Sequence, residues 1–193
     1  MADKSVFSRR EFLRILSVAV AAYPLSSLAE NRQQANQSTQ NLKDPWLTIA
    51  SVQEHLFPAE EDSPGANDIQ ALAYLHGMME TPDFEKEDAI LIHNGVGWLN
   101  DLATSEYKKK FIQLDADSKE KILRRVESSR AGSRWISMLL TYLLEALLTD
   151  PVYGGNPNGI GWTWLQHQPG FPTPPEDKKY YKLRKATYRN IKA

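Results

Sequence analysis

Residues 132–149, GSRWISMLLTYLLEALLT, decide the fold class of this 193-residue chain. Apolar side chains cover nearly the whole surface of a helix built from this stretch, and only Ser137, Thr141 and Glu145 form a narrow polar stripe. A helix that is apolar on almost every side is usually buried among other elements. The stretch is shorter and more polar than a membrane span, which takes about 20 apolar residues. We therefore predict that it forms the central core helix of the domain.

Further helices are predicted before this core helix, because apolar residues recur there at helical spacing. They cover residues 44–58, 67–79 and 86–103, a short segment near 106–112, and a segment that opens with the capping-box pattern Asp117-x-x-Glu120. In the helix over 67–79, the residues expected to share one apolar face are Ile69, Leu72, Ala73, His76 and Met79. No stretch alternates as a strand would. The predicted fold class is therefore all-α, a single bundle of five or six helices with an irregular C-terminal segment.

Two glycines, Gly95 and Gly97, lie inside the predicted helix over 86–103. Each glycine weakens a helix by about 1 kcal/mol relative to alanine. Close packing against a neighbouring helix would explain why they are there.

The first 29 residues have the layout of an export signal. The pair Arg9 and Arg10 is followed by Phe12 and Leu13 and then by a short apolar run, which is typical of twin-arginine signals. Ser27-Leu28-Ala29 resembles the small-x-small exit of such signals and predicts cleavage after Ala29, whereas an uncleaved signal would tether the protein to a membrane. The twin-arginine translocase carries folded proteins, often with a cofactor or partner attached. We therefore expect a periplasmic protein that is folded before export.

The rest of the chain divides into three predicted parts. Residues 30–43, ENRQQANQSTQNLK, contain almost no apolar side chain and predict a disordered tether. Residues 44–175 form the predicted helical domain, and residues 176–193 form a basic C-terminal tail. The tail is either solvated or docks on an acidic partner or an anionic lipid surface.

Composition excludes several classes of function. The chain has 23 basic and 24 acidic residues, so nothing in its charge suggests a nucleic-acid partner. It has no cysteine. Covalent haem attachment, cysteine-ligated iron–sulfur clusters and cysteine zinc sites are therefore impossible in this chain.

Residues 150–175, DPVYGGNPNGIGWTWLQHQPGFPTPP, are rich in glycine, proline and aromatic residues. The five glycines and six prolines argue against a regular helix. The large rings are Tyr153, Trp162, Trp164 and Phe171. Aromatic side chains on a rigid scaffold suit a protein interface. They could equally fold back and cap the bundle, and both interpretations remain open at this point.

The same segment resembles the signature of the gluconate 2-dehydrogenase subunit 3 family. The resemblance rests on Asp150-Pro151-x-Tyr153-Gly154-Gly155-Asn156, on Gly161-Trp162 and on Gly170-Phe171-Pro172. Leu56-Phe57-Pro58 and residues 62–66 are similar to an earlier turn of that family. The residues predicted to form a partner interface are Asp150, Pro151, Tyr153, Gly154, Gly155, Asn156, Gly161, Trp162, Trp164, Phe171 and Pro172.

The resemblance implies a non-catalytic small subunit. Such subunits accompany a large flavoprotein dehydrogenase of the glucose–methanol–choline type, which binds FAD, and commonly a cytochrome c subunit with haem c. The resemblance further implies that the small subunit carries the export signal and helps the flavoprotein mature and leave the cell.

No stretch of the sequence predicts catalytic chemistry in this chain itself. The four histidines, His55, His76, His93 and His167, include no pair at the helical spacing of a metal motif. His76 is the best candidate for a packed core histidine. The sequence lacks a dinucleotide fingerprint, a nucleophile elbow and a phosphate-binding loop. We therefore predict no catalytic residue, cofactor or metal site here; the alternatives are a stand-alone periplasmic enzyme or a structural module that docks on membranes.

Overall fold

The computed structural model describes residues 43–170 and 175–182. The predicted export signal with Arg9, Arg10, Phe12 and Leu13 lies outside the described residues, as do nearly all of the predicted tether and both Phe171 and Pro172.

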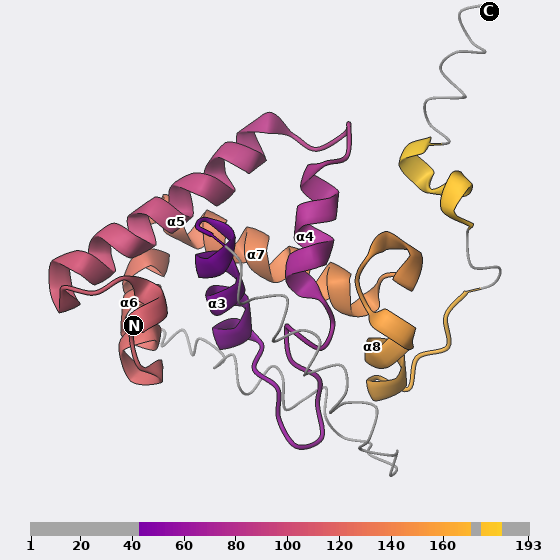
Figure 1. Ribbon diagram of the computed structural model, residues 1–193, viewed down its shortest axis with the longest axis horizontal. Helices are drawn as coiled ribbons and strands as arrows, with labels where there is room; N and C mark the ends of the chain where they lie inside the picture. Colours follow the sequence, from indigo (N-terminus) through magenta and orange to yellow (C-terminus); the bar gives the residue numbers. More distant parts are fainter. Residues whose placement is uncertain (1–42, 171–174, 183–193) are drawn as a thin grey trace, which may run out of the picture.

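The described residues form helices and turns, and they contain no β-strand (Figure 1). The α-helices are α3 (Trp46–Leu56), α4 (Ala71–Met79), α5 (Lys86–Tyr107), α6 (Ala116–Glu127), α7 (Arg130–Leu148) and α8 (Ile160–Trp164). The 3₁₀ turns are η1 (Phe111–Gln113), η2 (Pro151–Tyr153), η3 (Pro157–Gly159) and η4 (Glu176–Lys178). The predicted all-α bundle is therefore confirmed.

Helix α7 is the central helix, as its sequence predicts. It contacts α3, α4, α5, α6 and α8 (Figure 1). Trp135 near its start is fully buried, and the indole Nε1 donates a hydrogen bond of 3.2 Å to the carbonyl oxygen of Ile92 on α5. The helix is not buried on every side, however, because Leu144 and Leu148 are 43% and 50% exposed. No helix in the described part of the chain is long and apolar enough to cross a membrane.

The two glycines of α5 have different environments. A Cβ atom on Gly95 would lie 2.2 Å from the ring of Trp135, so only glycine allows α5 and α7 to approach this closely. The prediction of close packing is confirmed for Gly95. It is wrong for Gly97, where a Cβ atom would have no heavy atom within 4 Å.

Several helix boundaries differ from those predicted. Helix α6 is capped by Asp115, whose carboxylate accepts a 2.9 Å hydrogen bond from the Ser118 backbone N–H, and not by Asp117. Glu106 belongs to α5, and only the short turn η1 follows that helix. Helix α7 begins earlier than predicted because the Ser129 side chain accepts a hydrogen bond from the backbone N–H of Gly132.

Helix α4 begins four residues later than predicted, and a different face is buried. Gln70 adopts a left-handed conformation with φ 55°, so the chain before it cannot continue the helix. The residues of α4 that are buried are Ala71, Tyr74 and Leu75. His76 is the clearest error of the prediction, because its side chain is 49% exposed and packs beside the ring of Trp46, 4.7 Å away.

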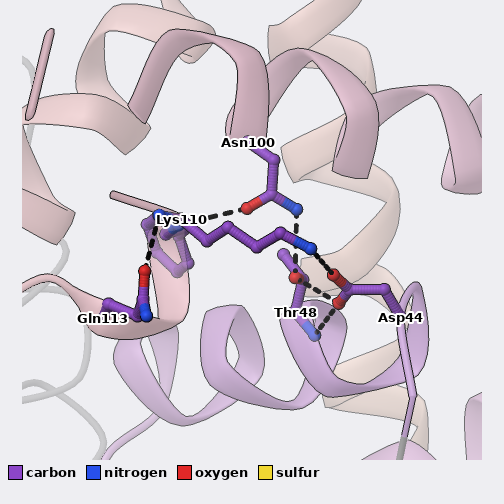
Figure 2. A network of polar contacts seen from close by, with 6 residues as sticks. Asp44, Thr48, Asn100, Lys110 and Gln113 are labelled. Carbon is purple, nitrogen blue, oxygen red and sulfur yellow. Dashed lines mark hydrogen bonds and ion pairs between the residues drawn. The ribbon is translucent and has the colours of Figure 1, made fainter. Parts of the chain in front are cut away.

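A polar network joins the start of α3 to α5 and η1 (Figure 2). The Asp44 carboxylate accepts hydrogen bonds from the backbone N–H and the hydroxyl of Thr48 in the first turn of α3. The Asn100 amide donates to the Thr48 hydroxyl at 3.2 Å and accepts from the Phe111 backbone N–H at 3.1 Å. The network holds the N-terminal end of the domain in one arrangement.

Candidate partner-docking site

The segment after α7 is more regular than its composition suggests. It forms η2, η3 and α8 in succession, so the expectation of no regular helix is wrong for residues 160–164. Pro151 and Pro157 occupy the first positions of the two 3₁₀ turns, where a proline loses no hydrogen bond. Gly154 and Gly159 end these turns with φ values of 93° and 69°, which favour glycine.

Asp150 starts this arrangement. Its carboxylate accepts a 3.0 Å hydrogen bond from the backbone N–H of Val152, which sets the first turn after α7. The Asp-Pro pair of the predicted signature is thus a cap followed by a proline preorganised for the turn.

Asn156 connects three parts of the chain. Its side chain is fully buried, and its backbone is left-handed with φ 50°. The side-chain amide donates to the Thr149 carbonyl at 2.9 Å and accepts from the Gly161 backbone N–H at 2.7 Å. Its own backbone N–H donates to the carbonyl of Ile69, which precedes α4. Asn156 therefore fixes the C-terminal segment to both α7 and the start of α4.

Two glycines let the segment lie directly on the backbone of α7. A Cβ atom on Gly155 would lie 2.8 Å from the carbonyl oxygen of Ala146, and one on Gly161 would lie 2.1 Å from that of Leu147. Any larger residue at these positions would push the segment away from the helix.

The two tryptophans pack against the bundle. The Trp162 indole N–H donates a 2.8 Å hydrogen bond to the carbonyl oxygen of Leu148, one of the carbonyls that the end of a helix leaves unpaired. The ring of Trp164 meets Phe57 edge to face at 6.1 Å. Both tryptophans are half-buried, so each contributes to the bundle and keeps part of its ring on the surface. The sequence left open whether these rings bind a partner or cap the bundle. Within the chain, Trp162 and Trp164 contact the bundle, as the capping interpretation expects.

Tyr153 instead faces the C-terminal tail. Its ring lies 5.9 Å from the ring of Tyr180 and 5.8 Å from the Lys179 ammonium group. The Tyr153 hydroxyl accepts a 3.4 Å hydrogen bond from the backbone N–H of Tyr180. The described part of the basic tail therefore packs on the domain, and it is more than the solvated extension that one interpretation of the sequence suggests.

Beside Tyr153 lies a cluster of tyrosines around Glu145. The Tyr74 hydroxyl donates a 3.1 Å hydrogen bond to the Glu145 carboxylate. Burial, together with the charge of Glu145, raises the pKa of Tyr74 well above its ordinary value. Burial and the same carboxylate raise the pKa of Tyr142 to about 12. The buried Tyr74 and the half-buried Tyr142 therefore join α4 to α7 beside Glu145.

The histidines do not come together. His55 contacts Glu120 with 2.9 Å between Nε2 and Oε2, which joins α3 to α6. His76 and His93 lie beside Trp46, and His167 is exposed. Within residues 43–170 and 175–182, no group of three or more histidines and carboxylates is arranged to hold a metal ion.

The structure brings together eight of the predicted interface residues around the end of α7. They are Asp150, Pro151, Gly154, Gly155, Asn156, Gly161, Trp162 and Trp164, while Tyr153 points toward the tail. Tyr74, Tyr142 and Glu145 are not among the predicted interface residues. The sequence shows that Tyr142 and Glu145 lie three residues apart on one helix. It does not show where α4 starts, and that start decides that Tyr74 faces Glu145.

Comparison with families of known proteins gives a match for this chain. No curated protein and no solved structure matches the chain significantly. A sequence model described as gluconate 2-dehydrogenase subunit 3 matches residues 43–170, the whole of the domain from α3 to α8. The chain therefore belongs to the gluconate 2-dehydrogenase subunit 3 family.

Proposed function

We propose that this chain is the non-catalytic small subunit of a periplasmic dehydrogenase complex. Its main partner is a large FAD-dependent subunit of the glucose–methanol–choline type, with a cytochrome c subunit and its haem c in complexes that transfer electrons onward. The chain carries the twin-arginine signal for the complex and helps the flavoprotein to mature and be exported.

One observation carries the proposal: on the same chain, a stretch with the layout of a twin-arginine signal precedes the domain that matches a dehydrogenase-subunit family. A subunit family implies a complex with other dehydrogenase subunits. The twin-arginine route moves folded proteins, so one signal is sufficient for two chains that bind each other before export. The flavoprotein then needs no signal of its own.

The docking site that supports the proposal is the end of α7 with the segment that follows it. Asn156 and the glycines fix this segment rigidly on the helix. Leu144 and Leu148 on α7 are half-exposed, and Trp162 beside Leu148 is half-buried. Apolar and aromatic side chains held in fixed positions bind a partner with little loss of conformational entropy. We expect the flavoprotein to bury this surface.

Two pairs of titratable side chains in the described domain join helices to each other. His55 and Glu120 join two helices, and Tyr74 and Glu145 join two others. These contacts support a scaffold role, since each group holds a helix in place. The redox chemistry is assigned to the FAD of the partner.

Co-expression of the chain with a flavoprotein subunit that has no signal tests the proposal. With the wild-type chain we expect the flavoprotein in the periplasm with FAD bound. With the double variant Arg9→Lys, Arg10→Lys we expect it to stay in the cytoplasm. Arg14→Lys is the matched control, because Arg14 lies outside the arginine pair and its replacement should leave export intact. Equal maturation and export of the flavoprotein without this chain would contradict the proposal.

A further inference from the structure

Residues 175–182, here called the strap, lie outside the family domain, which ends at residue 170, and yet they cover part of it. The strap contains the turn η4 and passes beside Tyr153. In Figure 1 its yellow ribbon lies to the right of α4. It is therefore an addition to the domain that lies on one residue of the proposed docking segment.

The strap meets the domain through two neighbouring side chains. Tyr180 contributes its ring at 5.9 Å from Tyr153 and its backbone N–H at 3.4 Å from the Tyr153 hydroxyl. Lys179 places its ammonium group over the face of the same ring, a favourable cation–π arrangement. The Lys179 side chain is only 12% exposed. The strap thus contacts the domain through one basic side chain and one aromatic side chain.

The strap holds its own shape. Glu176 pairs with Lys179 at 2.8 Å and with Lys182 at 3.2 Å, and the Lys182 ammonium also donates to the Glu176 carbonyl. The hydrogen bond with Glu176 raises the pKa of Lys179. These contacts present Lys179 to Tyr153 in a fixed position.

The surface under the strap has the opposite charge. Burial raises the pKa of Tyr180, and the nearby carboxylates of Asp83 and Glu145 raise it further. Glu80 lines the same cavity as Lys179. A basic and aromatic segment therefore covers an acidic surface around the ring of Tyr153.

The fit between strap and domain is incomplete. A cavity of about 310 Å³ remains between the end of α4 and the strap. Its walls are formed by Gly77, Met78, Glu80, Thr81, Pro82, Tyr153, Lys179 and Tyr181. The segment from Asp150 to Gly161 differs, because buried hydrogen bonds of Asn156 fix it on α7. A surface contact with a cavity beneath it is the easier of the two to displace.

We propose that the strap is a built-in competitor of the partner protein. In the free subunit it occupies the acidic and aromatic surface around Tyr153, and in the complex the flavoprotein displaces it with a basic side chain next to an aromatic ring. The inference rests on the proposed function. It adds where the flavoprotein docks, which side chains the flavoprotein presents there, and that the strap covers this docking surface in the free subunit.

A labelled peptide with the sequence of residues 175–193 tests the inference against the full-length chain. An attached segment competes with an effective concentration on the order of 1 mM. A peptide with a dissociation constant of about 100 µM should then bind the strap-weakened variant Lys179→Ala, Tyr180→Ala roughly ten times more tightly than it binds the wild-type chain. Fluorescence anisotropy measures both affinities. Folding of the variant is not at risk, because the buried apolar core lies between Ile49 and Leu147.

Two controls show whether the peptide binds as the strap does. A peptide that carries the same two alanines should not bind the strap-weakened chain. Lys178→Ala in the full-length chain should behave as the wild type, because Lys178 is an exposed neighbour that makes no ion pair within the described residues. Equal affinity for the wild-type and the strap-weakened chain, or no binding to either, would overturn the inference.

The purified flavoprotein then completes the test. We expect it to displace the bound peptide and to bind the strap-weakened chain more tightly than the wild type. If the flavoprotein binds but leaves the peptide in place, it docks elsewhere and the inference is wrong. That result would leave the proposed function intact, because the export experiment judges the function independently of the strap.

Discussion

Asn156 shows how much one side chain contributes at the C-terminal end of the domain. Its two side-chain hydrogen bonds join the end of α7 to the start of α8 in a fully buried position. Asn156→Ala removes both bonds and leaves the carbonyl of Thr149 and the N–H of Gly161 without these partners. We expect the free energy of unfolding to fall by about 3 kcal/mol, measured by urea denaturation.

Asn158 is the matched control for this prediction. It has a similar left-handed backbone with φ 56°, but its side chain is exposed. Asn158→Ala should lose only the preference of asparagine for this conformation, about 1 kcal/mol. If the two variants are equally stable, the hydrogen bonds of Asn156 do not hold the segment.

Gln53 is a buried polar residue that, unlike Asn156, has a side-chain nitrogen without a hydrogen-bond partner within the described part of the chain. Its side chain is 1% exposed, and its Nε2 has no hydrogen-bond partner within the described part of the chain. Gln53→Met keeps the volume and removes the unpaired donor, so we expect the protein to become about 1 kcal/mol more stable to urea. Asn100→Leu is the comparison, since Asn100 is paired with Thr48 and Phe111 and its loss should cost about 2 kcal/mol. A loss of stability in Gln53→Met would show that the amide is paired in solution.

At the residue scale, the sequence locates the important positions but not their roles. The Asp-Pro pair and the Gly-Gly-Asn run of residues 150–156 stand out as a signature. Turn chemistry also predicts that asparagine and glycine there adopt unusual backbone conformations. The partners of Asn156 lie 7 residues before it and 5 residues after it, with a third contact at Ile69. That last contact depends on tertiary structure, and no local pattern reveals it.

At the scale of elements, the contact between α5 and α7 depends on the absence of a side chain at Gly95. Gly95→Ala would place a methyl group 2.2 Å from the Trp135 ring and force the helices apart, so we expect a loss of about 3 kcal/mol in thermal or urea unfolding. Gly97→Ala is on the same helix with open space around it. It should stabilise the protein by about 0.5 to 1 kcal/mol through helix propensity alone. Similar effects of the two changes would contradict the packing described here.

The contact between α3 and α6 predicts a dependence of stability on pH. Burial pushes the pKa of Glu120 upward, but hydrogen bonds from His55 and Arg124 outweigh it and hold the pKa below its usual value. A lowered pKa means that Glu120 stabilises the fold above its unfolded pKa of about 4.3, and that this contribution is lost as the pH falls through the folded pKa.

Glu120→Gln should therefore be less stable than the wild type at pH 7 by about 0.5 kcal/mol, a small value because the carboxylate is 41% exposed. The difference should shrink below pH 4, as measured by urea denaturation across the pH range. Glu61→Gln is the control, since Glu61 is exposed and makes no ion pair within residues 43–170 and 175–182. A difference that persists unchanged at low pH would rule out the assigned role of Glu120.

Elements with a strong periodic pattern could be predicted from the sequence, and those set by single residues could not. The apolar pattern of residues 132–149 predicts α7 and its central position. The start of α4 was misplaced because the left-handed backbone of Gln70 has no sequence signal as clear as glycine or proline. This shift turns the helix so that Tyr74 faces inward and His76 outward.

At the scale of the whole molecule, the segment after α7 is fixed on the domain by buried hydrogen bonds, and we propose that the strap can be displaced from it. The sequence predicts the aromatic segment and the basic tail as separate features. Their contact at Tyr153 brings together residues 27 positions apart, and it follows only from the folded chain. The proposed docking surface therefore has two parts, the fixed rings beside α7 and the surface that the strap covers.

We propose that this chain supplies binding and export, while the flavin belongs to its partner. Native mass spectrometry of the chain co-expressed with the flavoprotein tests it most directly. We predict a complex with one copy of each chain and one FAD that stays with the large subunit on dissociation, and a mass of polypeptide alone for the separately purified chain. A flavin retained by this chain on its own, or the absence of any complex, would contradict the account.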